Sequence, residues 1–356
     1  MSTAGLLSLH VLGEGLVQST AEPLPGRVLG KERAVSTGDA PSGALGTAEP
    51  PPGHVLAPEH AMSAAEALPA LVPWESCRAL TCSVLPVRLA CNLRCPFCFS
   101  RSSISALQHE KSDLLHLDLG RYYRDARERG ATRLVITGGG EPLLRPELAV
   151  HLVREGRRFF DEIALFTNGT FLTRALAEEL AEAGLSYVCW SRHAVDDTDN
   201  RALMGRQAPL RDTFLEAAKP LKVRATCVMA RGHVDSREEA WRYIRALAPL
   251  GVREFTFKHT YVAYEQSVFR ESPADRWARE HQVEEDVFDG QGQVLGRLPW
   301  GPVIRRIDEV QVCYYREPTP RWEQENGTCR SLNLLSDGSV YASLEDSRSL
   351  LYRLSD

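Results

Sequence analysis

The 356-residue sequence contains no apolar run near the roughly 20 residues that a bilayer-spanning helix needs. Residues 1–17 include a short apolar stretch without a basic segment before it, so no signal peptide is predicted. Nine cysteines in a chain of this length do not make a compact disulfide framework. These absences predict a protein of a reducing, cytoplasmic compartment without a membrane partner.

The sequence also lacks an excess of positive charge. Lysine and arginine number 42 against 47 aspartates and glutamates, which gives a net charge of -5. This balance argues against a general binder of nucleic acids or acidic membranes, and we expect no nucleic-acid partner. A hydrophobic content of 43% with 25% charged residues suits one large domain with appendages.

The amino-terminal part shows little sign of regular structure. Residues 1–58 are rich in Ala, Gly, Pro, Ser and Glu and have no sustained helix or strand period, which predicts a disordered, low-complexity extension. An Ala-rich helical pattern at residues 59–71 ends at Pro73 and Trp74, so residues 59–79 are interpreted as a short helical segment.

Between residues 80 and 262, apolar strands alternate with amphipathic helices. Strands are expected at residues 83–89, 132–137, 162–166, 186–190, 222–229 and 254–259, and helices at 116–129, 146–158, 173–183, 210–219 and 236–250. Strands this apolar indicate a parallel sheet covered by crossover helices. A complete eight-unit barrel needs about 250 residues, so we predict an α/β fold with a partial (β/α)6 TIM-like barrel. Its ligands would lie beyond the carboxyl ends of the strands.

Residues 263–356 follow a different pattern, with many charges and prolines and only short periodic runs. A hairpin is expected from strands at 332–335 and 340–342 around Ser336-Asp337-Gly338. We therefore expect a C-terminal α+β cap that closes the open side of the barrel.

Three cysteines, Cys91, Cys95 and Cys98, follow the first expected strand at spacings of three and two residues. Thiols this close can bind one metal centre, but they are one ligand short of a closed zinc or four-cysteine iron-sulfur site. A cluster held by three thiolates would leave one iron open for a small molecule. A zinc or structural site is the alternative.

A glycine-rich turn, Gly138-Gly139-Gly140-Glu141-Pro142, follows the second expected strand. Glycines let a backbone edge approach a ligand closely, and a carboxylate can bind an ammonium group. A three-cysteine loop with an aromatic residue before its last cysteine, followed by a GGEP turn, resembles the signature of the radical S-adenosylmethionine (radical SAM) superfamily. The resemblance implies one [4Fe-4S] cluster on Cys91, Cys95 and Cys98, and SAM bound through its amino group by Gly139, Gly140 and Glu141.

Further cofactor contacts follow from the same resemblance. Phe97 would pack near the adenine, with an ordinary core aromatic as the alternative. Asn168 and Ser191 end the third and fourth strands, where relatives present polar groups to the ribose and carboxylate of SAM, although both residue types also form turns. Val228 and His259 lie near the ends of strands five and six, where the adenine would meet apolar and backbone groups.

The resemblance also implies the chemistry. A reduced cluster passes one electron to the sulfonium of SAM, which gives methionine and a 5′-deoxyadenosyl radical that takes a hydrogen atom from the substrate. An external one-electron reductant, such as a flavodoxin or ferredoxin, is then required.

A second cluster is not expected. Past the sixth strand only Cys313 and Cys329 remain, too few for another four-iron cluster. The C-terminal hairpin resembles a degenerate SPASM/twitch-like domain in which Ser343 stands where a cysteine would be expected. Without an internal electron acceptor, a redox-neutral reaction is predicted.

Several residues are candidates for the substrate cavity. Cationic and imidazole side chains at strand ends would suit an anionic group, or would form a solvated rim or pair with Asp196, Asp197 and Asp199: these are Arg192, His193, Lys258 and His259. Cys189 and Cys227 are candidate hydrogen-atom donors, with buried core cysteines as the alternative. Glu345 and Asp346 would reach the cavity from the cap.

The predicted function is hydrogen abstraction from a small-molecule substrate, a sugar or nucleoside intermediate of natural-product (antibiotic) biosynthesis. Decarboxylation, elimination and epimerisation are all redox-neutral, and the specific hypothesis is a lyase that decarboxylates a sugar-acid nucleoside. A peptide-modifying maturase is the first alternative, and a zinc-binding protein without catalytic activity is the second.

Overall fold

The computed structural model describes residues 70–107 and 114–354, which belong to one compact unit. The predictions for residues 1–58 and for the helical pattern up to residue 69 lie outside the described residues. From residue 70 on, the expected helix is replaced by a single 3-10 turn, η2 (Trp74–Ser76), and the first strand begins at Arg78. None of the helices in these ranges is long and apolar enough to cross a membrane.

Twelve strands of the described chain form one sheet, in the order β12-β11-β10-β1-β2-β3-β4-β5-β6-β9-β8-β7. The strands are β1 (Arg78–Leu85), β2 (Leu134–Ile136), β3 (Ile163–Thr167), β4 (Tyr187–Ser191), β5 (Val223–Met229), β6 (Glu254–His259), β7 (Gln293–Arg297), β8 (Val303–Ile307), β9 (Val310–Tyr315), β10 (Thr328–Leu335), β11 (Ser339–Tyr341) and β12 (Leu350–Arg353).

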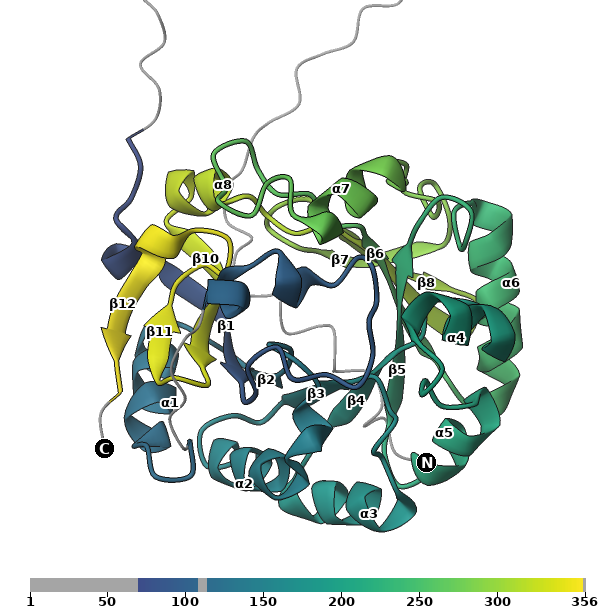
Figure 1. Cartoon of the computed structure of the whole chain (residues 1–356), viewed down its shortest axis with the longest axis horizontal. Helices are drawn as coiled ribbons and strands as arrows, with labels where there is room; N and C mark the ends of the chain where they lie inside the picture. Colours follow the sequence, from purple (N-terminus) through teal and green to yellow (C-terminus); the bar gives the residue numbers. More distant parts are fainter. Residues whose placement is uncertain (1–69, 108–113, 355–356) are drawn as a thin grey trace, which may run out of the picture. The chain divides into compact units, whose positions relative to one another are not determined.

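The central part of this sheet, from β10 through β1 to β6 and on to β9, is parallel throughout. Antiparallel strands extend it at both edges, with β11 and β12 beyond β10 and β8 and β7 beyond β9. These parallel strands curve around a common centre (Figure 1). Since β9 and β10 are not paired in the described sheet, the barrel has an open seam between them.

Helices cover the outside of the curved sheet, and α1, α2, α3, α5 and α6 lie outside the strands in Figure 1. The α-helices are α1 (Leu119–Glu128), α2 (Pro146–Gly156), α3 (Arg174–Ala183), α4 (Asp197–Met204), α5 (Arg211–Ala217), α6 (Arg237–Leu247), α7 (Pro273–Glu280) and α8 (Pro320–Glu325). Short 3-10 turns are η3 (Phe99–Arg101), η4 (Ile104–Leu107), η5 (Pro142–Leu144), η6 (Ala248–Leu250) and η7 (Ser347–Ser349).

Capping side chains fix where several helices begin. Asp118, Thr173 and Ser236 each accept a hydrogen bond from the backbone N–H three residues on, at the starts of α1, α3 and α6. This satisfies one of the backbone donors that a helix start leaves without a partner. Gly184 ends α3 with a φ of 102°, a left-handed conformation that glycine adopts without strain.

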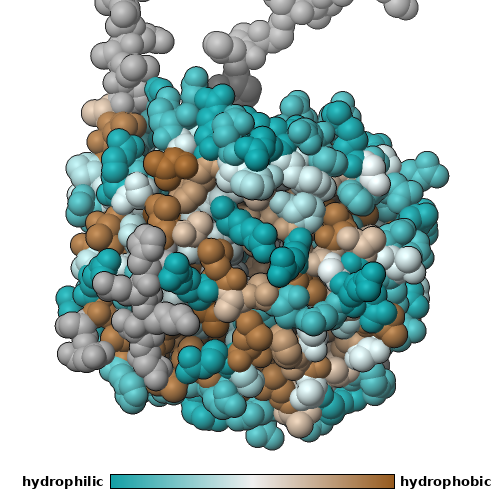
Figure 2. All heavy atoms as spheres, in the orientation of Figure 1, coloured by the Kyte–Doolittle hydropathy of each residue, from teal (hydrophilic) through white to brown (hydrophobic). Residues whose placement is uncertain are grey.

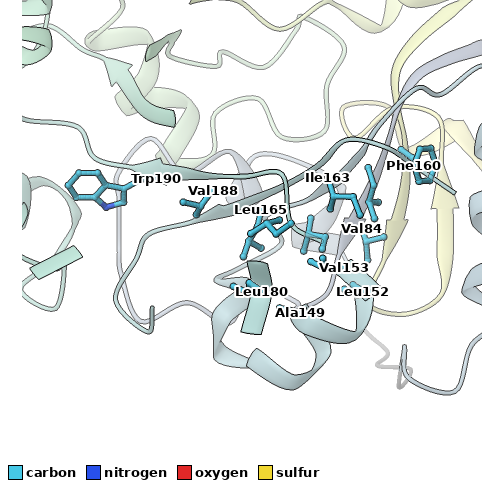
Figure 3. Packing of buried hydrophobic residues seen from close by; sticks show 14 of the residues in the cluster. Val84, Ala149, Leu152, Val153, Phe160, Ile163, Leu165, Leu180, Val188 and Trp190 are labelled. Carbon is cyan, nitrogen blue, oxygen red and sulfur yellow. The ribbon is translucent and has the colours of Figure 1, made fainter. Parts of the chain in front are cut away.

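The main core lies between the sheet and its helices. Alternate residues of the strands point outward, so that Leu165 of β3 and Val188 of β4 face the helices. Leu180 of α3 and Val153 of α2 belong to the same buried cluster (Figure 3). This packing buries the outer face of the parallel strands and leaves their other face to line the inside of the barrel.

The predicted α/β class and the partial TIM-like barrel are confirmed. All six expected strands are present within a few residues of their predicted bounds, except that β1 begins five residues earlier, and the C-terminal hairpin forms as β10 and β11. The structure adds what the sequence analysis did not foresee: residues 263–356 supply β9 and β10, which extend the parallel sheet at both edges. Helix α4 was also not predicted.

Candidate active site

The three-cysteine loop follows β1 and crosses the carboxyl-terminal mouth of the barrel (Figure 1). Cys91, Cys95 and Cys98 are all free thiols in the described chain. The backbone N–H of Leu93 donates to Cys91 Sγ at 3.4 Å, and Asn168 Nδ2 donates to the same sulfur at 3.7 Å. Hydrogen bonds of this kind to cluster sulfurs tune the reduction potential of iron-sulfur centres.

The region around α4 anchors this loop. Leu93 packs in a buried cluster with Met204 and Ala208, and the backbone N–H of Arg94 donates to Met204 O at 2.9 Å. The loop is therefore held also by α4, the helix that follows β4.

The donor set fits a multi-iron cluster better than a single ion. Within the described ranges, no three Cys, His, Asp or Glu side chains are gathered as ligands of one metal ion. Thiolates of an iron-sulfur cluster bind different iron atoms, so they need not converge on one point. The three thiols share one loop, an arrangement that suits such a cluster. Cys91, Cys95 and Cys98 are the residues that would hold a cluster.

The glycine-rich turn after β2 packs directly on the cysteine loop. A Cβ on Gly139 would lie 2.2 Å from Val87 O, and one on Gly140 would lie 2.0 Å from Ala90 O. Gly139 also has a φ of 78°. Its N–H donates to Ser100 Oγ at 3.0 Å, just past the last cysteine. Only glycines allow this close approach, so the turn and the cysteine loop pack together as one unit.

Glu141 connects this turn to the end of β3. Its N–H donates to Ala90 O at 2.7 Å, and its buried carboxylate accepts from Leu143 N, Thr167 Oγ1 and Asn168 N at 3.0, 2.6 and 2.8 Å. Burial raises the pKa of this carboxyl group. A carboxylate has about four acceptor positions, so a site for one further donor remains after these three bonds. Its contact with the SAM amine stays a prediction.

Asn168 lies against the cysteine loop as well. Besides its contact with Cys91, its Nδ2 donates to Asn92 Oδ1 at 3.0 Å, and its Oδ1 accepts from Thr170 N at 2.9 Å. The side chain thus holds a predicted cluster ligand in place, and its predicted contact with SAM is untested. Ser191 ends β4 on the inner face of the strand, where its predicted role is also untested.

His193 is buried beside the loop and is held as a neutral imidazole. Val228 N donates to His193 Nδ1 at 3.0 Å, so the ring proton is on Nε2. Burial, with Lys258 and Arg192 nearby, lowers the pKa of His193 to about 3. Its ring meets that of Phe97 edge-on, with centroids 4.8 Å apart. A neutral imidazole does not supply the positive charge that the sequence analysis expected here.

Two predicted cavity residues lie elsewhere. Arg192 is 1% exposed, and its Nη1 donates to Asp197 Oδ1 at 2.8 Å while Nη2 donates to Val195 O. It is therefore a structural partner of Asp197, as in the alternative interpretation. His259 packs against Tyr314 on the outer face of β6, opposite Lys258. Both corrections follow from side-chain alternation at strand ends, which places neighbouring residues on different faces.

The two candidate hydrogen-atom donors, Cys189 and Cys227, lie on different faces of the sheet. Cys227 belongs to the main core between sheet and helices, so its prediction as a cavity residue is wrong. Cys189 lies on the inner face of β4, in a small cluster with Ala164, Phe166 and Tyr187. Burial raises the pKa of Cys189 to about 11, so it is a neutral thiol at physiological pH. Its role as a donor stays a prediction.

Lys258 and Glu345 belong to a buried ionic cluster at the seam. Lys258 Nζ lies 2.9 Å from Glu317 Oε1, and Arg330 donates to Glu317 and, at 3.5 Å, to Glu345. These two cations lower the pKa of Glu317 to about 2, although its burial acts in the opposite direction. Burial raises the pKa of Glu345, which also accepts from Ser343 Oγ at 2.9 Å. Asp346, which is itself buried, instead pairs with the exposed Arg348.

One cavity joins the loop, the turn and the inside of the strands. We name it the barrel cavity; its volume is about 220 Å³. At the mouth it is lined by Phe99 and Ser100 from the loop and by Gly138 and Gly139 from the turn. Its walls come from inward-facing strand residues and from the seam: Thr81, Ser83, Arg133, Val135, Thr137, Ala164, Phe166, Tyr187, Arg224, Thr256, Lys258, Cys313, Tyr315, Glu317, Arg330, Ser331 and Asn333.

Most of these wall residues were not predicted from the sequence. Arg133 could have been predicted, because Arg133, Val135 and Thr137 are alternate residues of an expected strand and therefore share one face of it. Glu317 follows β9, which was not predicted, and Arg330 lies in the part of β10 that precedes the predicted strand at 332–335. In the view of Figure 2, hydrophilic residues surround the face that carries the mouth, and hydrophobic residues lie among them nearer its middle.

A second cavity of about 510 Å³ lies at the opposite end of the strands, beside Lys222, Val223 and Glu254. Its described lining includes no residue of the cysteine loop or the glycine turn. Active sites of parallel barrels lie at the carboxyl ends of the strands, so the smaller barrel cavity is the candidate substrate site.

Comparison with protein families matches residues 86–257 to the radical SAM superfamily. A GTP 3′,8-cyclase of Syntrophomonas wolfei subsp. wolfei is 28% identical over 267 residues, which cover 72% of this chain and 78% of the relative. A PqqA peptide cyclase of Streptomyces rochei is 32% identical over 150 residues, 41% of this chain and 39% of the relative. Among solved structures, SuiB of Streptococcus suis bound to S-adenosylmethionine aligns with a TM-score of 0.48 at 16% identity, over 75% of this chain and 60% of that chain.

The superfamily match contains both motifs, since Cys91, Cys95, Cys98 and the turn from Gly138 to Glu141 all lie within residues 86–257. The cofactors of this superfamily are a [4Fe-4S] cluster and S-adenosylmethionine, which agree with the free thiols and the close-packed turn at the mouth of the barrel. Residues 86–257 of the chain form a domain of the radical SAM superfamily.

Proposed function

We propose that this radical SAM enzyme abstracts a hydrogen atom from a small polar metabolite bound in the barrel cavity. The observation that carries this proposal is that the cavity is lined both by the cysteine loop and glycine turn and by the inner faces of the strands. When bound, the cluster and SAM supply a 5′-deoxyadenosyl radical as the hydrogen-abstracting agent.

The chain's own residues position and enclose the reactants. Cys91, Cys95 and Cys98 would hold the cluster, and Gly139 and Gly140, which pack on the cysteine loop, would contact SAM through their backbone. The curved sheet excludes bulk water, so that the reactive carbon is held next to the cofactor and side reactions are suppressed. The neutral ring of His193 supports Phe97 from the side of β4 and β5.

A redox-neutral reaction remains the proposal for the substrate step. Cys313 lines the barrel cavity, whereas Cys329 lies in the main core, so these two thiols do not form half of a second cluster site. A sugar or nucleoside intermediate of natural-product biosynthesis is the proposed substrate class, and decarboxylation of a sugar-acid nucleoside is the specific reaction. An external reductant of the flavodoxin or ferredoxin type supplies the electron.

Anaerobic reconstitution tests the proposal. The loaded chain should contain about four irons and convert SAM to 5′-deoxyadenosine and methionine when dithionite is added. A colourless protein that binds zinc and leaves SAM intact would contradict it.

A peptide-modifying maturase is the second candidate, because the relative from Streptomyces rochei is a PqqA peptide cyclase. The small volume of the barrel cavity favours a compact metabolite instead, since pockets for drug-sized ligands measure about 300–1,000 Å³. Transfer of deuterium into 5′-deoxyadenosine from a peptide deuterated at its α-carbons would favour the maturase.

A further inference from the structure

The barrel cavity exists because small polar residues face inward where a filled barrel has bulky branched ones. Interiors of parallel barrels are normally packed with Val, Ile and Leu. Here the corresponding wall positions include Thr81, Ser83, Thr256 and Ser331, with the small Ala164 beside them. The cavity therefore continues from the mouth to the amino-terminal ends of the strands, where Arg133 precedes β2 and Tyr187 begins β4.

The deep end of the barrel cavity carries an unbalanced ionic network. Glu162 accepts from Arg133, and Glu254 pairs with both Lys222 and Arg224. Tyr187 links the two halves, since its OH donates to Glu162 Oε1 at 2.8 Å and accepts from Arg224 Nη1 at 3.2 Å. Three cations thus share two carboxylates among the described residues, and the network has a net charge of +1.

Arg133 is the least satisfied cation of this network. Its Nη1 lies 3.4 Å from Glu162, and its Nε is buried without a hydrogen-bond partner among the described residues. Arg224, by contrast, contacts Glu254 with Nε and Nη2 at 2.9 and 2.7 Å. A buried donor without a partner costs free energy that a bound acceptor would recover.

The mouth of the cavity offers no comparable place for an anion. There Lys258 and Arg330 are matched by Glu317 and Glu345. An additional carboxylate at that end would meet two others. Ser105, in the turn η4 that follows the cysteine loop, also lines the cavity. Its hydroxyl is buried without a hydrogen-bond partner in the described chain, so it could accept or donate a hydrogen bond to a ligand.

We propose that the substrate carries a carboxylate that binds to Arg133 at the deep end, while its hydroxylated body lies along the Ser and Thr side chains toward the mouth. This inference rests on the proposed function, because it assigns the substrate class of the same cavity. It places the anionic group away from the strand-end residues Arg192 and His193, which are respectively ion-paired and neutral.

Equilibrium binding to matched sugars tests the inference on the reconstituted full chain with SAM present. D-Glucuronate and D-galacturonate differ from D-glucose and D-galactose in carrying a carboxylate in place of a hydroxymethyl group. We expect each acid to bind at least about tenfold more tightly than its neutral partner, an energy difference of about 1.4 kcal/mol. Arg133→Gln should abolish this preference and leave the affinity for the neutral sugars within about threefold.

Two variants keep the test independent of folding. Lys222→Gln removes the same unit of charge from the network on its exposed side, outside the barrel cavity, and should keep the preference. Arg133→Lys keeps the charge and should retain part of it. Equal binding of acids and neutral sugars, no binding of either, or an unchanged preference in Arg133→Gln would overturn the inference. Formation of 5′-deoxyadenosine without any added sugar is measured separately, and only its absence would count against the proposed function.

Discussion

Arg330 of β10 donates to Glu317, two residues beyond the end of β9, across the seam of the barrel. Within the described sheet these two strands share no ladder of backbone hydrogen bonds, so side chains close the barrel where the backbone does not. Lys258 of β6 approaches the same carboxylate, and Tyr315 OH donates to it at 2.9 Å. Glu317 therefore links β6, β9 and β10 across the seam through its side-chain contacts.

Replacing Glu317 by Gln should lower the free energy of unfolding by about 3 kcal/mol. The change leaves Lys258 without its carboxylate partner and Arg330 with only the 3.5 Å contact to Glu345, and uncompensated buried charges are costly. Urea unfolding measures the difference. Glu325→Gln breaks the exposed pair with Arg321 and should cost less than about 0.5 kcal/mol. Equal losses in the two variants would contradict a role of Glu317 in closing the seam.

The thermal stability of the protein should depend on pH through Glu323, which accepts a hydrogen bond from the backbone N–H of Arg330. Burial, with Glu345 nearby, raises the pKa of Glu323 from its ordinary value of 4.5 to about 8. The stability from its neutral form is complete below about pH 4.5 and is lost as the pH rises to about 8. Glu323→Gln keeps a neutral side chain, so its thermal stability should fall less over this range.

The profile of Glu323→Gln should not become entirely flat, because the pKa of Glu345 is raised as well. Thermal unfolding at intervals from pH 5 to pH 9 gives both curves, with Glu325→Gln as the control that should follow the wild type. Parallel curves for the wild type and Glu323→Gln would show that Glu323 is already ionised in the folded protein at neutral pH.

The sequence predicted the fold where local signals were strong. Strands such as β3 and β4 are short apolar runs between helices with clear caps, and these properties are fixed by neighbouring residues. The strands β9 and β10 were harder to predict, since Gln311 and Arg330 interrupt their apolar pattern and their partners, β6 and β1, lie far away in the sequence. Pairing over such distances is decided by tertiary contacts.

In the candidate active site, too, some residues could be predicted from the sequence and others could not. The cysteine loop and the glycine turn are contiguous motifs, and the contact between Gly140 and Ala90 explains why they occur together. The faces of residues at strand ends were not predictable, because a shift of one residue exchanges the inside and the outside of the barrel. Lys258 and His259 are adjacent in sequence, yet only Lys258 lines the barrel cavity.

Gly140→Ala should weaken SAM binding by at least about tenfold, or 1.4 kcal/mol. The added Cβ would lie 2.0 Å from Ala90 O, so the turn or the cysteine loop must move. Equilibrium dialysis with labelled SAM measures the affinity, and iron content shows whether the loop still holds a cluster. Gly296→Ala is the matched control, since its Cβ would meet no atom within 4 Å among the described residues. Unchanged SAM affinity in Gly140→Ala would argue against the turn as the SAM site.

Cysteine replacements test the number of clusters. Cys95→Ala removes one of three thiolates in the loop, so the reconstituted protein should lose its cluster and form no 5′-deoxyadenosine. Cys329→Ala and Cys313→Ala remove thiols that lie in the main core and in the wall of the barrel cavity, and both should keep about four irons per chain. Iron and sulfide analysis with electron paramagnetic resonance of the reduced protein gives the result. Loss of iron in Cys313→Ala or Cys329→Ala would mean that a second centre uses these thiols, and an internal electron acceptor would then make a net oxidation possible.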